Sequence, residues 1–282
     1  LDEKFVNESV ERQLNFSRRV RAADIKDVDW IAHSRFARRC AENSLVLLKN
    51  DDNALPLNTT ERVALIGDFA RNPRYQGAGS SLVNPTFLDN ILGAMQNSSL
   101  NFVGFAKGFE RRGGRNRRLL NGALKLAREA DTLVVCLGLG EGMELESCDR
   151  TTIDLPRNQI ELLLALAELG KKIVVVLSCG GVVDTNWDRY CSALIHAHLA
   201  GQSGGGAVVK ALTGEINPSG RLAESFPLKE EDVPCHEIYN KYPYKMDFAE
   251  GIYVGYKYYN TFGIPVKYPF GYGLSYTTFA YS

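Results

Sequence analysis

The sequence lacks an excess of charge of either sign. Its 282 residues include 33 Lys plus Arg and 33 Asp plus Glu, so the formal net charge is zero. A neutral chain has no surplus of cations to displace the counterions of phosphates, which argues against a nucleic-acid-binding protein. Long hydrophobic runs are also lacking, since stretches such as 173–177 fall far short of the roughly 20 residues of a membrane span. With 45% hydrophobic residues, we expect a soluble globular protein rather than a disordered one.

Cysteine motifs are lacking as well. The six Cys form no CxxC pair and no grouping with His that would suit zinc. Cys136 and Cys179 lie inside apolar strand patterns, where a thiol usually behaves as a small buried hydrophobe. We therefore expect free thiols. The chain begins without Met or a recognisable signal segment, which indicates a piece of a longer protein and favours the cytoplasm slightly over secretion.

What is present is an alternation of strand-like and helix-like segments. Residues 5–48 have helical periodicity. Short apolar runs of the kind found in buried parallel strands then follow at 63–68, 102–105, 133–137, 173–177 and 193–199, and helix-like stretches separate them at 86–97, 115–130, 156–170 and 203–213. This order predicts an α/β fold, a three-layer α/β/α sandwich with a mostly parallel sheet.

Two segments do not follow this alternation of strands and helices. From about residue 228 the chain is rich in Tyr, Gly and Pro and is predicted to be an ordered tail. Within it, the spacing of four tyrosines favours a strand that packs on the core over a platform for a leaving group: Tyr253, Tyr256, Tyr258 and Tyr259. The Arg-rich run 111–118 is predicted to be a solvated turn at a helix start rather than a phosphate or RNA site.

Ligands of doubly wound sheets bind beyond the carboxyl ends of the strands, so the loops that follow the apolar runs are the candidate sites. The first loop contains Gln76, Gly77, Gly79, Ser80 and Ser81. Its glycines permit close approach of the backbone, and its neutral polar groups suit a polyhydroxy ligand. An ordinary Gly/Ser turn is the competing interpretation.

The second loop contains three carboxylates, Glu141, Glu144 and Glu146, followed by Asp149 and Arg150. Its Gly138-x-Gly140 start does not continue as a dinucleotide-binding motif. Crowding of carboxyl groups favours a protonated form near neutral pH, which a general acid requires. The residues alone leave open whether this loop is catalytic or a solvated acidic loop.

Two further motifs were weighed. His196 and His198 fall on one face of a predicted strand, which would allow a metal pair, but no carboxylate or Cys lies nearby in sequence and a structural role is favoured. The glycines at 204–206 open a helix but lack the Gly-Lys-Ser/Thr ending of a phosphate-binding loop. The residues alone therefore predict a polar, acidic crevice without a complete catalytic set.

Taken together, the motifs resemble the second, α/β-sandwich domain of glycoside hydrolase family 3, the β-glucosidases, β-xylosidases and related exo-glycosidases. Six strings in the family's order carry the resemblance, and they lie at 41–57, 75–81, 144–159, 217–222, 253–259 and 270–276.

The resemblance implies a retaining β-glycosidase that uses two carboxyl groups, one as nucleophile and one as acid/base. The family pattern Glu-x-Glu-Gly-aromatic-Asp-Arg places the acid/base on Glu146, with Glu144 as runner-up. It implies that the 76–81 loop lines the sugar site, and we expect Asp149 and Arg150 to hold the loop in place. The resemblance implies no metal and no organic cofactor. The nucleophile would be an Asp on an N-terminal (β/α)8 barrel. Residues 1–62 are too few for such a barrel of roughly 250 residues.

The implied organisation is therefore residues 1–50 as the helical end of the missing barrel and a linker, and 51–282 as the sandwich. This chain departs from the family where Ser147-Cys148 replaces Gly and an aromatic residue, which restricts the backbone beside Glu146. A stand-alone carbohydrate-binding or regulatory module is the competing hypothesis. A flavodoxin-like nucleotide-binding domain is disfavoured by the failed glycine pattern.

Overall fold

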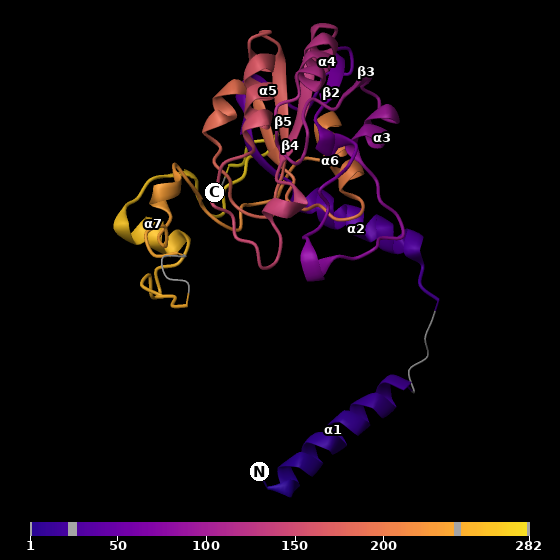
Figure 1. Ribbon diagram of the computed structural model, residues 1–282. Helices are drawn as coiled ribbons and strands as arrows, with labels where there is room; N and C mark the ends of the chain where they lie inside the picture. The colour runs from indigo at the N-terminus through magenta and orange to yellow at the C-terminus, as the bar shows by residue number, and fades with distance from the viewer. Residues whose placement is uncertain (1, 22–26, 240–243, 281–282) are drawn as a thin grey trace. The chain divides into compact units, whose positions relative to one another are not determined.

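The computed structural model describes residues 2–21, 27–239 and 244–280. The chain divides into two compact units, one ending at His33 and the other beginning at Ser34 (Figure 1). The helices are α1 (Glu3–Arg21), α2 (Trp30–Ser44), α3 (Ile91–Gln96), α4 (Arg117–Arg128), α5 (Arg157–Ala167), α6 (Gly204–Thr213) and α7 (Tyr256–Phe262). The strands are β1 (Val46–Asn50), β2 (Arg62–Ile66), β3 (Asn101–Ala106), β4 (Thr132–Gly138), β5 (Lys172–Ser178), β6 (Ala193–His196), β7 (Phe226–Pro227) and β8 (Val266–Tyr268).

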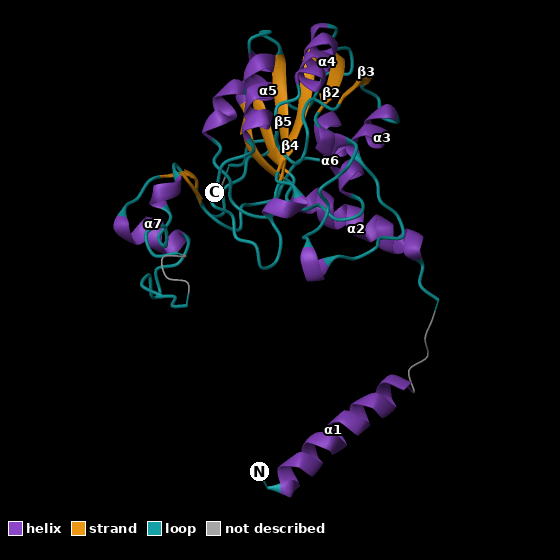
Figure 2. Cartoon of the chain, in the orientation of Figure 1, coloured by secondary structure: helices purple, strands orange, loops and turns teal. Residues whose placement is uncertain are grey.

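Six strands form one mixed sheet in the order β1-β6-β5-β4-β2-β3. β2 to β6 run parallel, whereas β1 pairs antiparallel with β6 at one edge. Helices α4 and α5 pack together on one face of the sheet, and α3 and α6 pack together on the other (Figure 2). The predicted α/β/α sandwich with a mostly parallel sheet is confirmed, and the described residues contain no (β/α)8 barrel.

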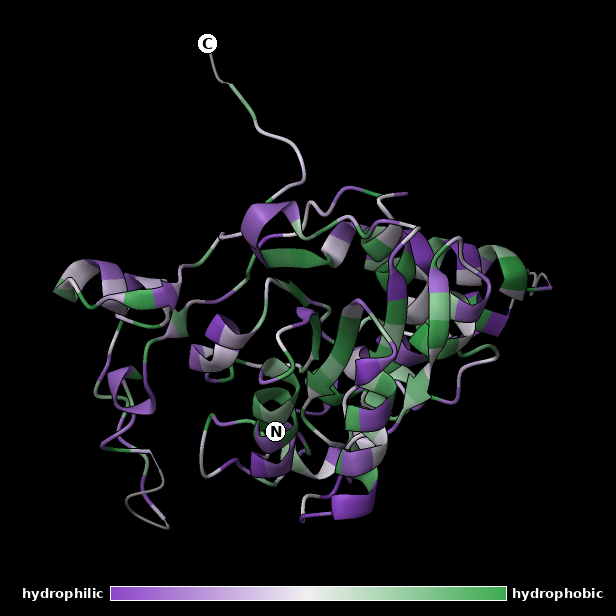
Figure 3. Cartoon of the chain, turned by 90° about the horizontal axis from the view of Figure 1, so that it is seen from above, coloured by the Kyte–Doolittle hydropathy of each residue, from purple (hydrophilic) through white to green (hydrophobic). Residues whose placement is uncertain are grey.

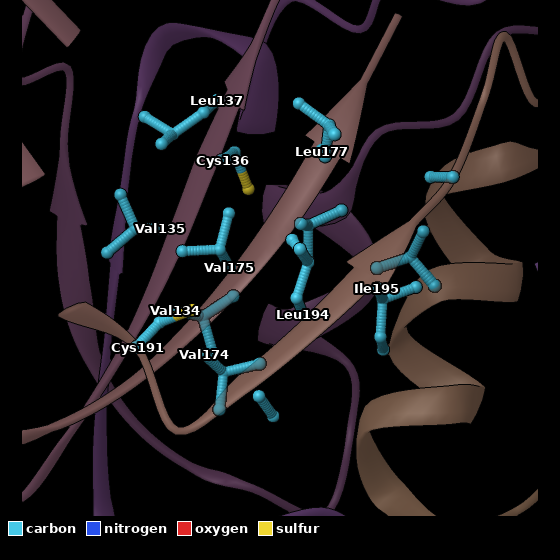
Figure 4. Packing of buried hydrophobic residues seen from close by; sticks show 14 of the residues in the cluster. Val134, Val135, Cys136, Leu137, Val174, Val175, Leu177, Cys191, Leu194 and Ile195 are labelled. Carbon is cyan, nitrogen blue, oxygen red and sulfur yellow. The ribbon is translucent and has the colours of Figure 1, made fainter. Parts of the chain in front are cut away.

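The core is built from strands that are buried on both faces. Every residue of β4 is buried, as is nearly all of β5, which explains why these segments read as continuous apolar runs rather than as alternating patterns. Figure 4 shows their Val and Leu side chains lying against Leu194 and Ile195 of β6. The colouring of Figure 3 places the hydrophobic residues on the strands and on the helix faces that cover them.

Local sequence explains where several helices begin and end. The side chains of Asn90 and Asn116 accept hydrogen bonds from the first-turn N–H groups of α3 and α4, as N-cap residues do. Gly214 and Gly263 follow α6 and α7 with left-handed backbone angles, which glycine adopts without a steric penalty. These caps place the start of α4 and the end of α6 close to the predicted boundaries, whereas α3 begins five residues later than predicted.

All six cysteines are free, as predicted, and Cys136, Cys179 and Cys191 are buried. Burial raises the pKa of Cys191 to about 12 and raises that of Cys136 as well. None of the described helices combines the length and the hydropathy that a bilayer-spanning helix requires.

Two predictions of local structure are wrong. The helical reading of residues 5–48 holds for α1 and α2, with residues 22–26 outside the described residues, but 46–50 is the edge strand β1. Its Val-Leu-Leu run is buried against β6, and this pairing overrides the helical spacing of the preceding segment. The tyrosine-rich segment is helix α7 rather than a strand, and only Tyr259 of its four tyrosines is buried.

Candidate active site

The candidate site lies where the sheet reverses its winding. From β2 the chain crosses to β3 at the edge, and from β3 it crosses back over β2 to β4. The connections of the neighbouring strands β2 and β4 therefore lead away in opposite directions, which opens a crevice at their carboxyl ends. The two loops that the sequence analysis singled out, 67–81 and 139–155, follow these two strands. The fold thus brings both candidate loops to one place.

The two loops contact each other through Glu146. Ala78 pairs with Leu145 in an isolated parallel bridge, and the Ser80 hydroxyl donates a hydrogen bond to the Glu146 carboxylate. Gly79 adopts a left-handed φ of +79°, and a Cβ on it would lie 3.2 Å from the Glu146 Cβ. Glu146 itself is exposed, so its carboxyl group is accessible to a ligand in the crevice.

The other predicted sugar-contacting residues mainly brace their own loop. The Gln76 amide donates to the Val83 carbonyl (3.0 Å) and to the Tyr75 hydroxyl (2.8 Å), and it accepts from the Val83 N–H (3.0 Å). Ser81 donates to the Ala78 carbonyl, and its hydroxyl fills the space where a Cβ on Gly77 would lie. The structure therefore places Ser80 beside Glu146, and Gln76 and Ser81 within the frame of the loop.

Glu144 occupies a different environment from Glu146. Its Oε1 accepts hydrogen bonds from the N–H groups of Gly180 (2.7 Å) and Gly181 (3.0 Å), which follow β5. Its Oε2 lies 3.6 Å from Nη2 of Arg74, whose side chain is buried. Glu144 is thus tied to the neighbouring loops, whereas Glu146 faces outward.

Glu141 is also paired. Its carboxylate accepts a 2.7 Å hydrogen bond from Nη1 of Arg111, whose Nε donates to the buried Asp68 at 2.9 Å. The Arg-rich run is therefore a solvated turn before α4, as predicted, except that Arg111 is drawn into an ion-pair network. An open cavity of about 1050 Å³ lies between residues 107–113 and 140–143, and this network lines it.

Asp149 and Arg150 hold the far end of the loop. Nη1 of Arg150 donates to the Val182 carbonyl at 2.9 Å. A hydrogen bond to the Asp149 carboxylate raises the pKa of the Tyr239 hydroxyl. The backbone contact of Arg150 is of the kind that we expected. The partner of Asp149 is a tyrosine of the tail segment, which the sequence analysis did not foresee.

Ser147, the residue after Glu146, has backbone angles that glycine favours. Its φ is +68°, in the left-handed region that glycine favours, and the Cys148 N–H donates to the Leu145 carbonyl to close a tight turn. A non-glycine residue in this region costs about 1–2 kcal/mol. The turn therefore holds a non-glycine residue in a strained backbone conformation beside Glu146.

The two histidines form a buried contact rather than a metal site. Their ring centroids lie 3.8 Å apart, and no cluster of three metal-ligating side chains occurs among the described residues. Burial, with a further contribution from His198, lowers the pKa of His196 to about 3, so its imidazole is neutral. His198 has a left-handed φ of +52° and a pKa that is also lowered by burial.

The backbone N–H groups of two glycines at the start of α6 bind a carboxylate that also forms an ion pair within the protein. The Asp89 carboxylate accepts from the N–H groups of Gly205 (2.8 Å) and Gly206 (2.9 Å), and Arg38 pairs with the same carboxylate at 2.9 Å. A carboxylate of the protein itself therefore occupies the position that a phosphate would take in a nucleotide-binding loop.

The sequence analysis did not identify Arg74 or the Gly180–Gly181 pair, which together bind the Glu144 carboxylate. The signal for the glycines was a Gly-Gly step directly after the apolar run of β5, at the same edge of the sheet as the two loops. Arg74 carried no signal, because an arginine in a polar loop is usually exposed, whereas this residue is only 4% exposed.

Comparison with known proteins agrees with this geometry. The family model of the glycosyl hydrolase family 3 C-terminal domain matches residues 45–276. Thermostable beta-glucosidase B of Acetivibrio thermocellus is 41% identical, over 100% of this chain and 38% of its own length. An exo-alpha-(1->6)-L-arabinopyranosidase of Bifidobacterium longum is 39% identical, over 94% of this chain and 36% of its own.

Solved structures give the same result. The crystal structure of a family 3 β-glucosidase from Bifidobacterium adolescentis superposes with a TM-score of 0.88 at 40% identity, covering 94% of this chain and 39% of that one. β-Glucosidase 3B of Thermotoga neapolitana, solved with glucose, gives a TM-score of 0.76 at 29% identity, covering 89% of this chain and 39% of that one. This chain spans well under half the length of these relatives. It belongs to glycosyl hydrolase family 3, and it corresponds to the C-terminal domain of its β-glucosidase-type enzymes.

Proposed function

We propose that this chain is the second domain of a retaining, exo-acting β-glycosidase, in which Glu146 is the general acid/base and the 76–81 loop forms part of the sugar site. The enzyme hydrolyses terminal non-reducing β-D-glucosyl or related residues. The nucleophilic Asp belongs to a (β/α)8 barrel, in the same or another chain.

The observation that carries the proposal is the contrast among the three carboxylates of one loop. Glu144 is enclosed by backbone N–H groups and a buried arginine, and Glu141 is paired with Arg111. The oxygens of these two carboxylates are therefore engaged by groups of the protein itself. Glu146 instead has a serine hydroxyl as partner and is exposed. It is the member of the three that is best suited to exchange a proton with a ligand.

The proposed reaction needs two steps. In the first, the Asp carboxylate attacks the anomeric carbon while the Glu146 carboxyl gives its proton to the departing glycosidic oxygen. In the second, Glu146 accepts a proton from water as the water oxygen attacks the anomeric carbon, and the bond to Asp breaks. The two carboxyl groups must stand about 5 to 5.5 Å apart for this mechanism. The barrel and this domain must therefore meet closely at the crevice.

The relatives suggest which sugars are compatible with the site. One is named for a β-glucoside and the other for an α-L-arabinopyranoside. Both sugars are pyranosides that carry an equatorial glycosidic bond in their common chair form. They differ at C4, whose hydroxyl is axial in the arabinopyranoside and equatorial in the glucoside, and in the hydroxymethyl group, which arabinopyranose lacks. We therefore propose an equatorial pyranoside as the substrate class, with β-D-glucosides first.

Replacement of Glu146 by Gln in the complete enzyme tests the assignment. General acid/base catalysis contributes typically 10²–10⁴-fold, so we expect losses of this order for substrates with poor leaving groups. Substrates with activated aryl leaving groups need little protonation and should retain most of the rate of their first step. Glu141→Gln, in the same loop, is the matched control and should have little effect. Equal rates for Glu146→Gln and the unmodified enzyme on all substrates would refute the proposal.

A further inference from the structure

The loop that carries Glu146 is fastened at two points to the segment that follows β5. Near its start, the Glu144 carboxylate accepts from the N–H groups of Gly180 and Gly181. Near its end, the Arg150 guanidinium donates to the Val182 carbonyl. Three consecutive residues therefore hold both ends of the turn in which Glu146 lies.

Arg74 fastens Glu144 from the other side. This arginine belongs to the loop after β2, and its Nη2 lies 3.4 Å from the main-chain carbonyl oxygen of Glu144 and 3.6 Å from its carboxylate. Its side chain is 2% exposed and that of Glu144 is 13% exposed. Glu144 thus joins loops from three neighbouring strands, β2, β4 and β5, two positions before the exposed Glu146 in the chain.

The charges make this arrangement specific for a carboxylate. One oxygen accepts two backbone hydrogen bonds, and the other faces a buried guanidinium. A buried cation needs a nearby anion, because an uncompensated charge in a protein interior is strongly unfavourable. An amide in place of the carboxylate would still accept from the two N–H groups but would direct its NH₂ group, another donor, toward Arg74. We therefore expect the loop to shift when the charge is removed.

We propose that Glu144 is a positioning residue. Its contacts with Arg74 and with the Gly180–Gly181 backbone hold Glu146 in the orientation that catalysis needs. This inference rests on the proposed function of Glu146. Misplacement of a catalytic group by 1 Å can cost on the order of 100-fold in rate. Only one residue, Leu145, separates Glu144 from Glu146. Leu145 pairs with Ala78 and with Cys148, so a displacement at Glu144 is transmitted directly to Glu146.

The test is a set of variants of the complete enzyme, assayed well below their melting temperatures. We expect Glu144→Gln to lower kcat/KM on the order of 100-fold for substrates with poor leaving groups and much less for activated aryl leaving groups, because it acts through Glu146, with the limbs of the pH–rate profile unchanged. Glu144→Asp keeps the charge on a shorter side chain and should recover part of that loss. Glu141→Gln is again the matched control.

The outcomes separate the two proposals. If Glu144→Gln behaves like the Glu141→Gln control while Glu146→Gln loses activity on poor leaving groups, the positioning role is wrong and the acid/base assignment stands. If Glu144→Gln instead shows the leaving-group dependence and Glu146→Gln does not, both proposals are wrong.

Arg74→Gln provides a second route if Glu144→Gln does not fold. It should lower kcat/KM with the same dependence on the leaving group, and the double variant Arg74→Gln/Glu144→Gln should lose little more than either single variant, because the two residues act as a unit. If the fold-loss in rate of the double variant equals the product of the two single fold-losses, the inference is wrong.

Discussion

Because His196 is buried, we expect this domain to become less stable at mildly acidic pH. The side chain is 1% exposed, and it packs against the rings of His198 and Phe226. Its pKa is about 3 in the folded chain, against about 6.5 in an unfolded one. Between these values the unfolded state binds a proton that the folded state does not, so stability falls as the pH is lowered below 6.5.

The expected magnitude follows from the size of the shift. The loss is about 1.4 kcal/mol for each pH unit below 6.5, or about 2 kcal/mol between pH 7 and pH 5 for this residue alone. His198, whose pKa is lowered as well, adds to the loss. Replacement of His196 by Phe removes the titrating group and keeps an aromatic ring in the cluster, so the variant should lose about 2 kcal/mol less over this interval.

Urea unfolding at pH 7 and pH 5 measures this difference directly. The comparison is the change in the free energy of unfolding for the unmodified chain, for His196→Phe and for His33→Gln, which replaces an exposed histidine. The control should follow the unmodified chain. Equal losses for the unmodified chain and His196→Phe would show that His196 is not held neutral in the folded state, and the reasoning would fail.

Three further predictions concern the site loop and the thiols. Ser147→Gly should stabilise the chain by about 0.5 kcal/mol, measured as a higher urea midpoint, because relief of the left-handed strain exceeds the added entropy of the unfolded chain. Gly79→Ala should destabilise it by about 1–2 kcal/mol and lower the kcat of the complete enzyme, since a methyl group there would lie 3.2 Å from the Glu146 Cβ. A thiol reagent should modify Cys148 rapidly in the folded chain, but Cys136 only after unfolding. Destabilisation by Ser147→Gly, no effect of Gly79→Ala, or equal rates for the two thiols would each contradict the structure.

The parts of the fold that were predictable are those in which local pattern and tertiary environment agree. The runs at 133–137 and 173–177 are apolar throughout because β4 and β5 are covered on both faces, and this is visible in the sequence. The strand at 46–50 was not predicted, since its identity depends on pairing with β6, nearly 150 residues away in the chain. The tyrosine segment was misread because tyrosines at 256 and 258–259 fit a short helix as well as a strand.

The site was predictable to a similar degree. The two loops could be named from their glycines, serines and carboxylates, and the strand order brings them together. The sequence could not distinguish the roles of Glu144 and Glu146 by itself, because the difference lies in their surroundings. Glu144 meets Arg74 and two backbone N–H groups from distant segments, and Glu146 meets the Ser80 hydroxyl.

The central claim, that Glu146 is the acid/base of a retaining enzyme, is tested most directly with azide. In the complete enzyme carrying Glu146→Ala, an activated aryl β-glucoside should still form the glycosyl-enzyme, but its hydrolysis should be slow because no base activates water. Azide needs no such activation, so we predict that it restores turnover and yields the β-glucosyl azide. Absence of rescue for Glu146→Ala, with rescue for Glu144→Ala instead, would contradict the account.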